Sequence, residues 1–388
     1  MQQTERLPEG RGQRGARLPE RAAHGPFDLP FVLLVVLISA VGLVMMFSAS
    51  YASAHRYQQS ATHFFFRQGL FLLLGLAAMY LISQFNYQYL RALSIPIMVT
   101  AMVLLVLVLF IGTKLNGARR WIYIGEAFNF QPSEIAKIAV IILFSAMICT
   151  YGERMKKFRH GILPFVLILG AIAGLMLLEP HISGTVLILG VGAVLMFAGG
   201  ANWRWFAAAL AAGAGGAYVV LTTMSHAITR IAIWQDPFSD AGDTGYQIVQ
   251  SLYAVGSGGL FGLGLGKSRQ KYLYLPEQHN DFVFAIVCEE LGLVGAIIIL
   301  LLFMALILRG YWIAVHARDR FGSLLVTGIT TLLALQTFLN MAVVTNLIPV
   351  TGVSMPFFSY GGTSLLIQLA EMGIVLAVSR QIPAPKSG

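Results

Sequence analysis

This sequence has few charged residues. Only 11% of its 388 residues are charged and 57% are apolar, whereas a typical soluble domain has about 25% charged residues. A chain with so few charged groups is solvated by lipid rather than by water. Its apolar residues fall in blocks near 20 residues long, the length that a helix needs to cross a hydrocarbon core of roughly 30 Å.

Cysteine and nucleotide-binding motifs are also scarce or missing. Cys149 and Cys288 both lie in apolar blocks, so they imply neither a disulfide nor a redox compartment. The glycine-rich run from Gly256 to Gly266 has Phe261 where a phosphate-binding loop ending at Lys267 would need glycine. It contains no Gly-x-Gly-x-x-Gly pattern either. We also expect no soluble domain that could house a nucleotide-driven motor, which argues against an ATPase.

The apolar blocks predict an all-α polytopic membrane protein with about ten transmembrane helices, because a backbone in lipid must satisfy its own hydrogen bonds. The first block exceeds the apolar core of about 7–15 residues in a secretory signal, which favours an uncleaved anchor over a signal peptide. The expected spans are residues 29–50, 66–85, 93–111, 133–150, 161–178, 184–199, 205–222, 282–308, 322–347 and 363–379.

The distribution of basic residues predicts the orientation. With a cytoplasmic N-terminus, sixteen of the 26 Lys and Arg residues fall on the inner side, as the positive-inside rule requires. The predicted organisation is a cytoplasmic Arg-rich tail at 1–28, a membrane domain at 29–379 and a second cytoplasmic tail at 380–388. The loop at 223–281, between the seventh and eighth spans, is then extracytoplasmic. The net charge of +9 does not indicate nucleic acid, because the arginines sit at helix ends rather than in one basic stripe.

Ten basic residues remain on the outer side, against the topological preference. Snorkelling of long side chains at a helix end accounts for Arg67. It does not account for Arg119 and Arg120, or for the cluster of Lys267, Arg269 and Lys271, which all lie in expected loops. These residues therefore predict another use for positive charge on the outer side.

Two outer segments could bind an anion. Glu134 and Lys137 are three residues apart at the start of the fourth span, so they share a helix face, and charges inside a span usually face an interior cavity. A structural ion pair that locks two helices is the alternative. The glycine-rich run beside Lys267 to Lys271 suits a polyanionic lipid headgroup such as a pyrophosphate, because bare backbone N–H groups and cations both approach anions closely. The alternative there is a re-entrant glycine hairpin packed on helices.

Asp281 stands where the eighth span begins. Partial desolvation at the membrane boundary raises the pKa of a carboxyl group, which is the property that a general base needs. Simple capping of the helix is the alternative. On a helix with about 100° of rotation per residue, Glu289 rather than Glu290 would share the cavity of Asp281. Ser359 lies in a segment broken by Pro and Gly, and broken backbone at membrane depth lines a cavity or is buried in protein.

In their order and spacing these motifs resemble the SEDS family, the shape, elongation, division and sporulation proteins typified by FtsW, RodA and SpoVE. The wording Phe357-Phe358-Ser359 resembles the division and sporulation branches more than the elongation branch, which stays an alternative. One departure is His181, where the family often has aspartate, so no acid or metal role is assigned there. The matching stretches are residues 116–122, 131–134, 245–247, 250–251, 256–266, 281–292 and 356–362.

The resemblance implies a peptidoglycan glycosyltransferase of the bacterial cytoplasmic membrane. It would polymerise lipid II on the outer leaflet beside a class B penicillin-binding protein, embedded in membrane lipids and with no nucleic acid. The essential aspartate of the family falls on Asp281. No cofactor or protein-bound metal is identified, and the lipid pyrophosphate would depart with or without a divalent cation. The substrate-binding residues would be Arg119, Arg120, Glu134, Lys137, Lys267, Arg269, Lys271, Glu289 and Ser359.

Two other functions stay open on the sequence alone. Intramembrane charges and broken helices also suit a lipid-linked sugar flippase or another secondary transporter. The concentration of polar motifs on one side argues against it, because a transporter should have matched motifs on both faces. A non-catalytic scaffold for the transpeptidase is the third possibility.

Overall fold

The computed structural model describes residues 25–58, 62–115, 118–124, 128–211, 231–243 and 245–382. In this part of the chain eight helices are long and apolar enough to cross a membrane, which confirms the helical polytopic fold. They are α1 (Leu29–Gln58), α2 (His63–Ser83), α4 (Ser94–Ile111), α5 (Pro132–Tyr151), α6 (Leu163–Leu178), α11 (Val283–His316), α12 (Arg320–Val344) and α13 (Gly362–Ser379).

The remaining elements connect or extend these helices. Helix α7 (Ile182–Ala198) is apolar but only 17 residues long. Nine of the ten expected spans coincide with the eight long helices and α7. The expected span at 205–222 is described only in part: residues 203–211 are helical and the rest lies outside the described residues. The short connectors are α3 (Gln88–Ala92), η1 (Gly152–Lys156) and η2 (Phe158–Ile162).

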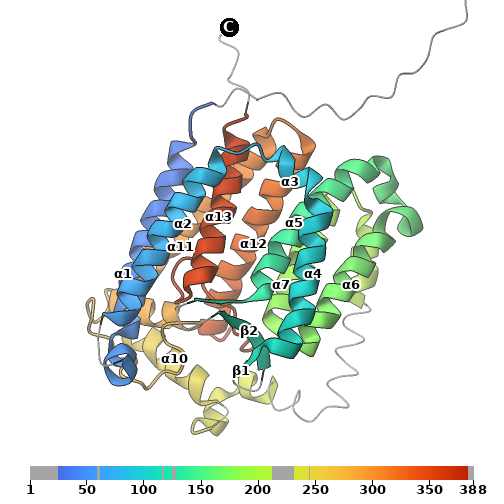
Figure 1. Cartoon of the computed structure of the whole chain (residues 1–388). Helices are drawn as coiled ribbons and strands as arrows, with labels where there is room; N and C mark the ends of the chain where they lie inside the picture. Colours follow the sequence, from blue (N-terminus) through green and yellow to red (C-terminus); the bar gives the residue numbers. More distant parts are fainter. Residues whose placement is uncertain are drawn as a thin grey trace, which may run out of the picture.

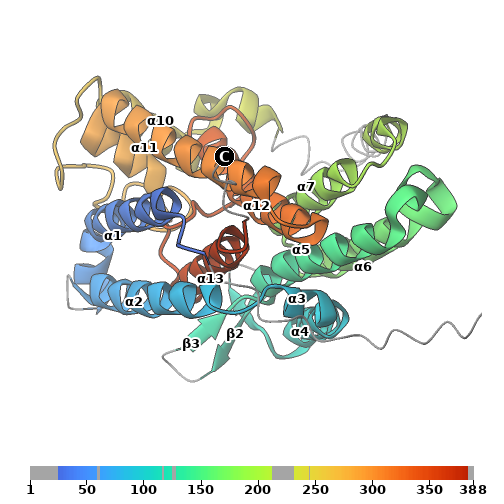
Figure 2. The same cartoon turned by 90° about the horizontal axis from the view of Figure 1, so that it is seen from above.

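Helix α13 forms the centre of the bundle. It packs against α2, α5, α11 and α12, and the view along the bundle places it between them (Figure 2). Within its apolar window 72% of the residues are buried, against 28% for α2. Its polar residues Gln368 and Glu371 are accordingly buried in protein, because a charged or amide side chain facing lipid is costly.

Both described ends of the chain meet at one end of the bundle, which we call the tail end (Figure 1). The Gly25 N–H donates to the Arg380 carbonyl at 2.8 Å. Asp28 pairs with Arg309 from α11 at 2.8 Å. These contacts fix the start of α1 beside the ends of α11 and α13.

A small antiparallel sheet covers the opposite end of the bundle, which we call the sheet end (Figure 1). It consists of β1 (Thr113–Leu115), β2 (Ala118–Ile124) and β3 (Phe128–Phe130) in the order β1-β2-β3. The prediction of an all-α chain missed this sheet. Aromatic and β-branched residues in β2 favour the pleated conformation, but the strands are too short for a period to stand out in the sequence.

The loop that precedes α11 also lies at the sheet end. Its described part contains η3 (Pro237–Asp240), α10 (Tyr246–Ser257) and a stretch of turns from 258 to 282. The turns begin with the glycine-rich run, which packs against a break in α11 at Gly292, where φ is 67° and ψ is −167°. A Cβ on Gly262 would lie 2.1 Å from the Glu290 carbonyl oxygen, so only glycine allows this approach.

The break in α11 is filled by hydrogen bonds from the loop. The N–H groups of Leu263 and Gly264 each donate at 3.0 Å to the carbonyls of Glu289 and Glu290, respectively. The N–H of Leu293 donates to the Gly259 carbonyl at 2.9 Å. Backbone groups freed by the break are therefore satisfied inside the protein, as membrane depth requires. This arrangement matches the glycine hairpin packed on helices, one of the two interpretations of this run.

Candidate active site

A cavity of about 520 Å³ opens at the sheet end. This size lies within the range of about 300–1,000 Å³ that is usual for small-molecule sites. Its walls come from α2, β2, β3, α12, the starts of α5, α7 and α13, the loop before α11 and the segment before α13. It brings together five of the residues that the sequence predicts for the site, which are Arg120, Glu134, Lys137, Asp281 and Ser359.

The backbone leading into Asp281 is held from two directions. The Ser359 hydroxyl donates to the Asn280 carbonyl at 2.8 Å. The Asn340 amide of α12 donates to the Asp281 carbonyl at 2.6 Å and to the Val353 carbonyl at 2.7 Å. Ser359 and Asn340 thus fasten the Asp281 backbone to the broken segment before α13, which fixes the carboxylate at the cavity wall.

The Asp281 carboxyl group does not cap α11. Phe282 occupies the N-cap position, and no side chain bonds there, so the capping alternative is wrong. Burial and, to a smaller extent, the neighbouring Glu277 raise the pKa of Asp281 to about 6, against the opposing effect of Arg120. A carboxyl group with a pKa near the operating pH can accept a proton and release it again.

Arg120 reaches the cavity from β2 and is anchored by the turn between α6 and α7. Its guanidinium donates to the Glu179 carbonyl at 3.3 Å and makes a short contact with the Pro180 carbonyl. Burial lowers the pKa of Arg120, although Glu179 and Asp281 oppose the change. Burial also lowers the pKa of His181 to about 3, with Arg120 and Lys137 adding to the shift. The imidazole is therefore neutral at physiological pH.

Glu179 is the buried acid of the same turn. Both of its carboxyl oxygens lack a hydrogen-bond partner, and burial raises its pKa to about 8, although Arg120 acts to lower it. Because this value exceeds the ordinary 4.5, the folded protein holds a proton here that the unfolded chain has lost. The group therefore removes stability as the pH rises from about 4.5 towards 8, and the loss is complete above the higher value.

We expect Glu179→Gln to remove this pH dependence. Glutamine resembles the protonated acid in shape and charge, so the variant should melt close to the wild type at low pH. Above neutral pH it should melt higher, by about 1–2 °C for each kcal/mol regained in a chain of this length. Thermal unfolding in detergent across pH measures the effect. Equal pH dependence in both proteins would show that Glu179 is not protonated in the fold.

The predicted pair of Glu134 and Lys137 forms at the start of α5. The ammonium and carboxylate are 2.8 Å apart, and their side chains are 11% and 4% exposed for Glu134 and Lys137, respectively. Both residues line the cavity. The pair therefore combines the two interpretations made from the sequence: it is an internal ion pair, and it presents charge to a ligand.

The sequence did not single out Arg67 and Gly352 as site residues, but both line the cavity. Arg67 extends from α2 towards Tyr360, and its charge lowers the pKa of that phenol, although burial raises it more. The interpretation of Arg67 as a snorkelling side chain is wrong, since it faces the cavity. A Cβ on Gly352 would lie 3.2 Å from Asp281 Oδ2, so this glycine leaves room beside the carboxylate.

The other predicted residues lie outside the cavity lining. Arg119 donates to the Leu109 carbonyl at 3.0 Å, at the end of α4. Lys267 and Arg269 have exposed side chains, and their contact with a substrate stays a prediction. Lys271 is buried in an ion pair with Glu290 at 2.9 Å.

Glu289 does not share the cavity with Asp281, contrary to the expectation from helical rotation. Its carboxylate accepts from the backbone of Arg269 at 2.9 Å. The helical count fails because α11 starts at Val283, so Asp281 is not on the helix. Among the described residues no group of three or more His, Cys, Asp or Glu side chains could hold a metal ion.

Fold and cavity together define a polytopic membrane protein with a polar chamber at one end of its bundle, where a titratable carboxylate faces cations. This chain belongs to the FtsW/RodA/SpoVE family, whose model, described as "Cell cycle protein", matches residues 28–383.

Curated relatives match almost end to end. The chain is 41% identical over 355 residues to stage V sporulation protein E of Bacillus subtilis, which covers 91% of this chain and 97% of that protein. It is 40% identical over 359 residues to the probable peptidoglycan glycosyltransferase FtsW of Geobacter metallireducens, with 92% and 95% covered.

Solved structures share the fold. A chain from a peptidoglycan synthase complex, described as coordinating polymerization and crosslinking, superposes with a TM-score of 0.79 at 28% identity and covers 91% of this chain and 98% of that chain. The rod shape determining protein RodA of Thermus thermophilus gives a TM-score of 0.69 at 29% identity, with 92% and 98% covered.

Proposed function

We propose that this protein is a peptidoglycan glycosyltransferase that polymerises lipid II at the outer face of the bacterial cytoplasmic membrane. The observation that carries the proposal is the placement of Asp281 in a cavity that also holds Arg67, Arg120 and Lys137. A base and several cations in one chamber suit a reaction that removes a proton and expels an anion. The relatives named as glycosyltransferases support the same activity.

The proposed reaction is an inverting glycosyl transfer. Asp281 accepts the proton of the acceptor sugar hydroxyl as that oxygen attacks the anomeric carbon of the donor. The bond from the anomeric carbon to the phosphate oxygen breaks, and the lipid pyrophosphate leaves with the electron pair. Arg120 and Lys137 stabilise the negative charge that develops on it, with Arg67 as a third cation of the same chamber. Glu134 holds Lys137 in place, and Ser359 fixes the backbone beside the base.

The proposed orientation in the membrane follows from the distribution of basic residues. Basic residues flank the tail end, which by the positive-inside rule supports cytoplasmic termini and a cavity on the outer side. The partner is a class B penicillin-binding protein that crosslinks the polymer. A structural neighbour that belongs to a synthase complex supports such a partnership. Division or sporulation is the proposed process, in keeping with the relatives.

The experiment that tests this function uses purified protein, its transpeptidase partner and fluorescent lipid II. We expect polymer to form in detergent and in proteoliposomes, with the substrate supplied on the outer leaflet. Movement of labelled lipid across the bilayer with no polymer formed would instead support the transporter. Absence of both activities, with the partner still bound, would support a scaffold.

A further inference from the structure

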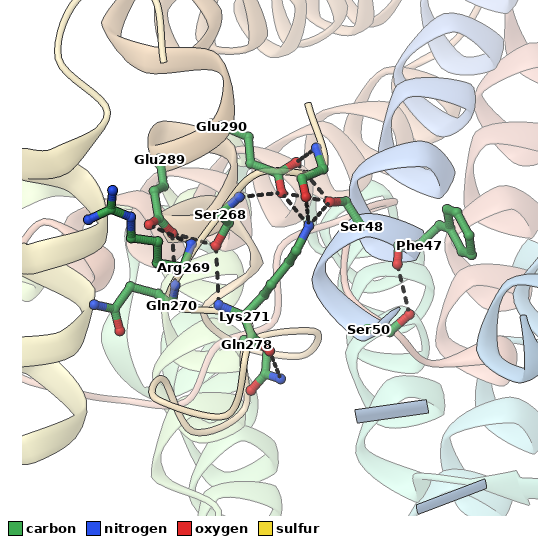
Figure 3. Close-up of polar contacts among 11 residues, drawn as sticks. Phe47, Ser48, Ser50, Ser268, Arg269, Gln270, Lys271, Gln278, Glu289 and Glu290 are labelled. Carbon is green, nitrogen blue, oxygen red and sulfur yellow. Dashed lines mark hydrogen bonds and ion pairs between the residues drawn. The ribbon is translucent and has the colours of Figure 1, made fainter. Parts of the chain in front are cut away.

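A buried polar cluster lies outside the cavity, between α1, α11 and the loop before α11 (Figure 3). Its centre is the Lys271 ammonium, which donates to the Glu290 carboxylate at 2.9 Å, the Ser48 hydroxyl at 3.1 Å and the Gly266 carbonyl at 2.5 Å. An ammonium has three protons, so all of them are used within the protein. Lys271 therefore has none left for a substrate anion.

The carboxylates of this cluster bind the backbone of the loop. Glu290 accepts from the N–H of Gly266 at 2.9 Å and of Ser268 at 3.2 Å. Glu289 accepts from the N–H of Arg269 at 2.9 Å and, through a short contact, from the Ser268 hydroxyl. Two adjacent acids of α11 thus fix the conformation of residues 266–270 (Figure 3).

Gln278 connects this ordered part of the loop to the segment that precedes Asp281. The Gln278 amide donates to the Lys271 carbonyl at 3.1 Å and to the Ser53 hydroxyl of α1 at 2.7 Å. Gln278 is buried and lies three residues before Asp281. The same residue therefore touches the cluster at Lys271 and begins the segment that ends at the base.

We propose that Lys271 and Gln278 are positioning residues that hold the loop against α1 and thereby fix Asp281 in the cavity. The proposal rests on the proposed function, because it assigns these residues to the same reaction. It gives Lys271 a role through the protein backbone rather than through contact with the lipid pyrophosphate. A displacement of about 1 Å at a reacting group can cost on the order of 100-fold in rate, so such support matters.

The test measures polymerisation by the full-length protein with its transpeptidase partner. Lys271→Met removes the ammonium, and Gln278→Leu breaks the link to Lys271 and Ser53. We expect each to lower kcat roughly tenfold or more, with KM for lipid II changing by less than about twofold. A rise in KM with kcat unchanged would mean that uniform substrate binding was lost, and it would overturn the proposal.

Matched controls lie in the same elements. Gln270→Leu makes the same change in the same loop, at a side chain whose oxygen has no hydrogen-bond partner. Ser50→Ala deletes a hydroxyl that bonds within its own helix, to the Phe47 carbonyl at 3.3 Å, whereas Ser48→Ala removes a contact of the cluster. We expect both controls to keep wild-type kcat and Ser48→Ala to lower it.

The pH dependence of kcat separates positioning from a merely structural role. If the loop loosens, Asp281 becomes better hydrated and its pKa falls, so the acid limb of the profile moves to lower pH. An equal loss of rate at every pH would mean fewer folded molecules, and it would overturn the proposal. The charged groups that share the cavity with Asp281 and would remain are Arg67, Arg120, Glu134, Lys137 and Glu277.

Two comparisons keep the test decisive. Removing one partner of a buried ion pair strands the other charge, so Lys271→Met can fail to fold; Gln278→Leu, which leaves the pair intact, then decides the outcome. Asp281→Asn is assayed in parallel. If it is inactive while Lys271→Met and Gln278→Leu keep wild-type kcat, the positioning role is wrong and the proposed function stands. If Asp281→Asn is fully active, the assignment of Asp281 as the base fails; if the wild type itself forms no polymer, the proposed function fails.

Discussion

Replacing Asp281 with asparagine should lower the rate of lipid II polymerisation by about 10²–10⁴-fold, which is the usual contribution of a general base. Asparagine has nearly the same shape but cannot accept the proton. The cations of the cavity remain, so lipid II should still bind. Initial rates with fluorescent lipid II measure the loss of polymerisation, and photo-crosslinking of the substrate to the purified variant measures whether lipid II still binds.

The stability of this variant provides an internal control. The folded protein raises the pKa of Asp281 from 3.8 to about 6, so the ionised group removes stability as the pH rises through that interval. Asp281→Asn should therefore be at least as stable as the wild type at neutral pH, and loss of activity cannot be attributed to unfolding. Asp243→Asn makes the same change at an exposed acid of the same loop and should leave the rate unchanged. Wild-type polymerisation by Asp281→Asn would remove the base from the mechanism.

Arg120→Gln should produce the second large effect, a loss in kcat/KM on the order of 10²–10³-fold, as expected when a donor to developing negative charge is deleted. A shift of the pH–rate profile distinguishes this loss from a general loss of folded protein. Arg120 lowers the pKa of Asp281, so without it the base stays protonated to higher pH. The acid limb of the pH–rate profile should therefore move upward.

Arg119→Gln is the informative comparison, because the neighbouring guanidinium is exposed and lies outside the cavity lining. A loss equal to that of Arg120→Gln would support the sequence-based assignment of both arginines to the substrate. A loss confined to Arg120→Gln would support a substrate site made only of residues that line the cavity. An unshifted acid limb in Arg120→Gln would contradict the electrostatic contact with Asp281.

The helices were predictable because hydropathy is a local property: a block of about 20 apolar residues has few alternatives in lipid. The break in α11 was not predictable in the same way. It depends on Gly292 meeting the glycine-rich run some thirty residues earlier in the chain, and no local pattern records that pairing. The sheet at 113–130 escaped prediction because its strands have only three to seven residues.

The partners of the basic residues could not be predicted from the sequence. Arg67 and Lys271 both stand near the sheet end, and sequence position gives no sign of their different partners. Lys271 is neutralised by Glu290, 19 residues away, and donates a hydrogen bond to Ser48, 223 residues away. Arg67 instead faces the cavity. The charge of a residue is local information, but its pairing depends on the tertiary fold.

The place of Asp281 in the cavity was predictable because two independent features agree there, a carboxylate at the start of a span and a motif in the correct order along the chain. The environment of the Asp281 carboxyl group could not be predicted from the sequence. The raised pKa depends on burial by the segment before α13 and on Glu277, against the charge of Arg120. These groups come together only when α12 and α13 close the cavity.

The role of Asp281 as general base is best measured through the pH dependence of single-turnover polymer formation. We expect the wild-type rate to fall on acidification through one ionisation with a pKa of about 6. We also expect the small residual rate of Asp281→Asn to show no such ionisation. The same acid limb in both proteins, or a wild-type rate that does not change across this interval, would contradict the assignment of Asp281 as the base.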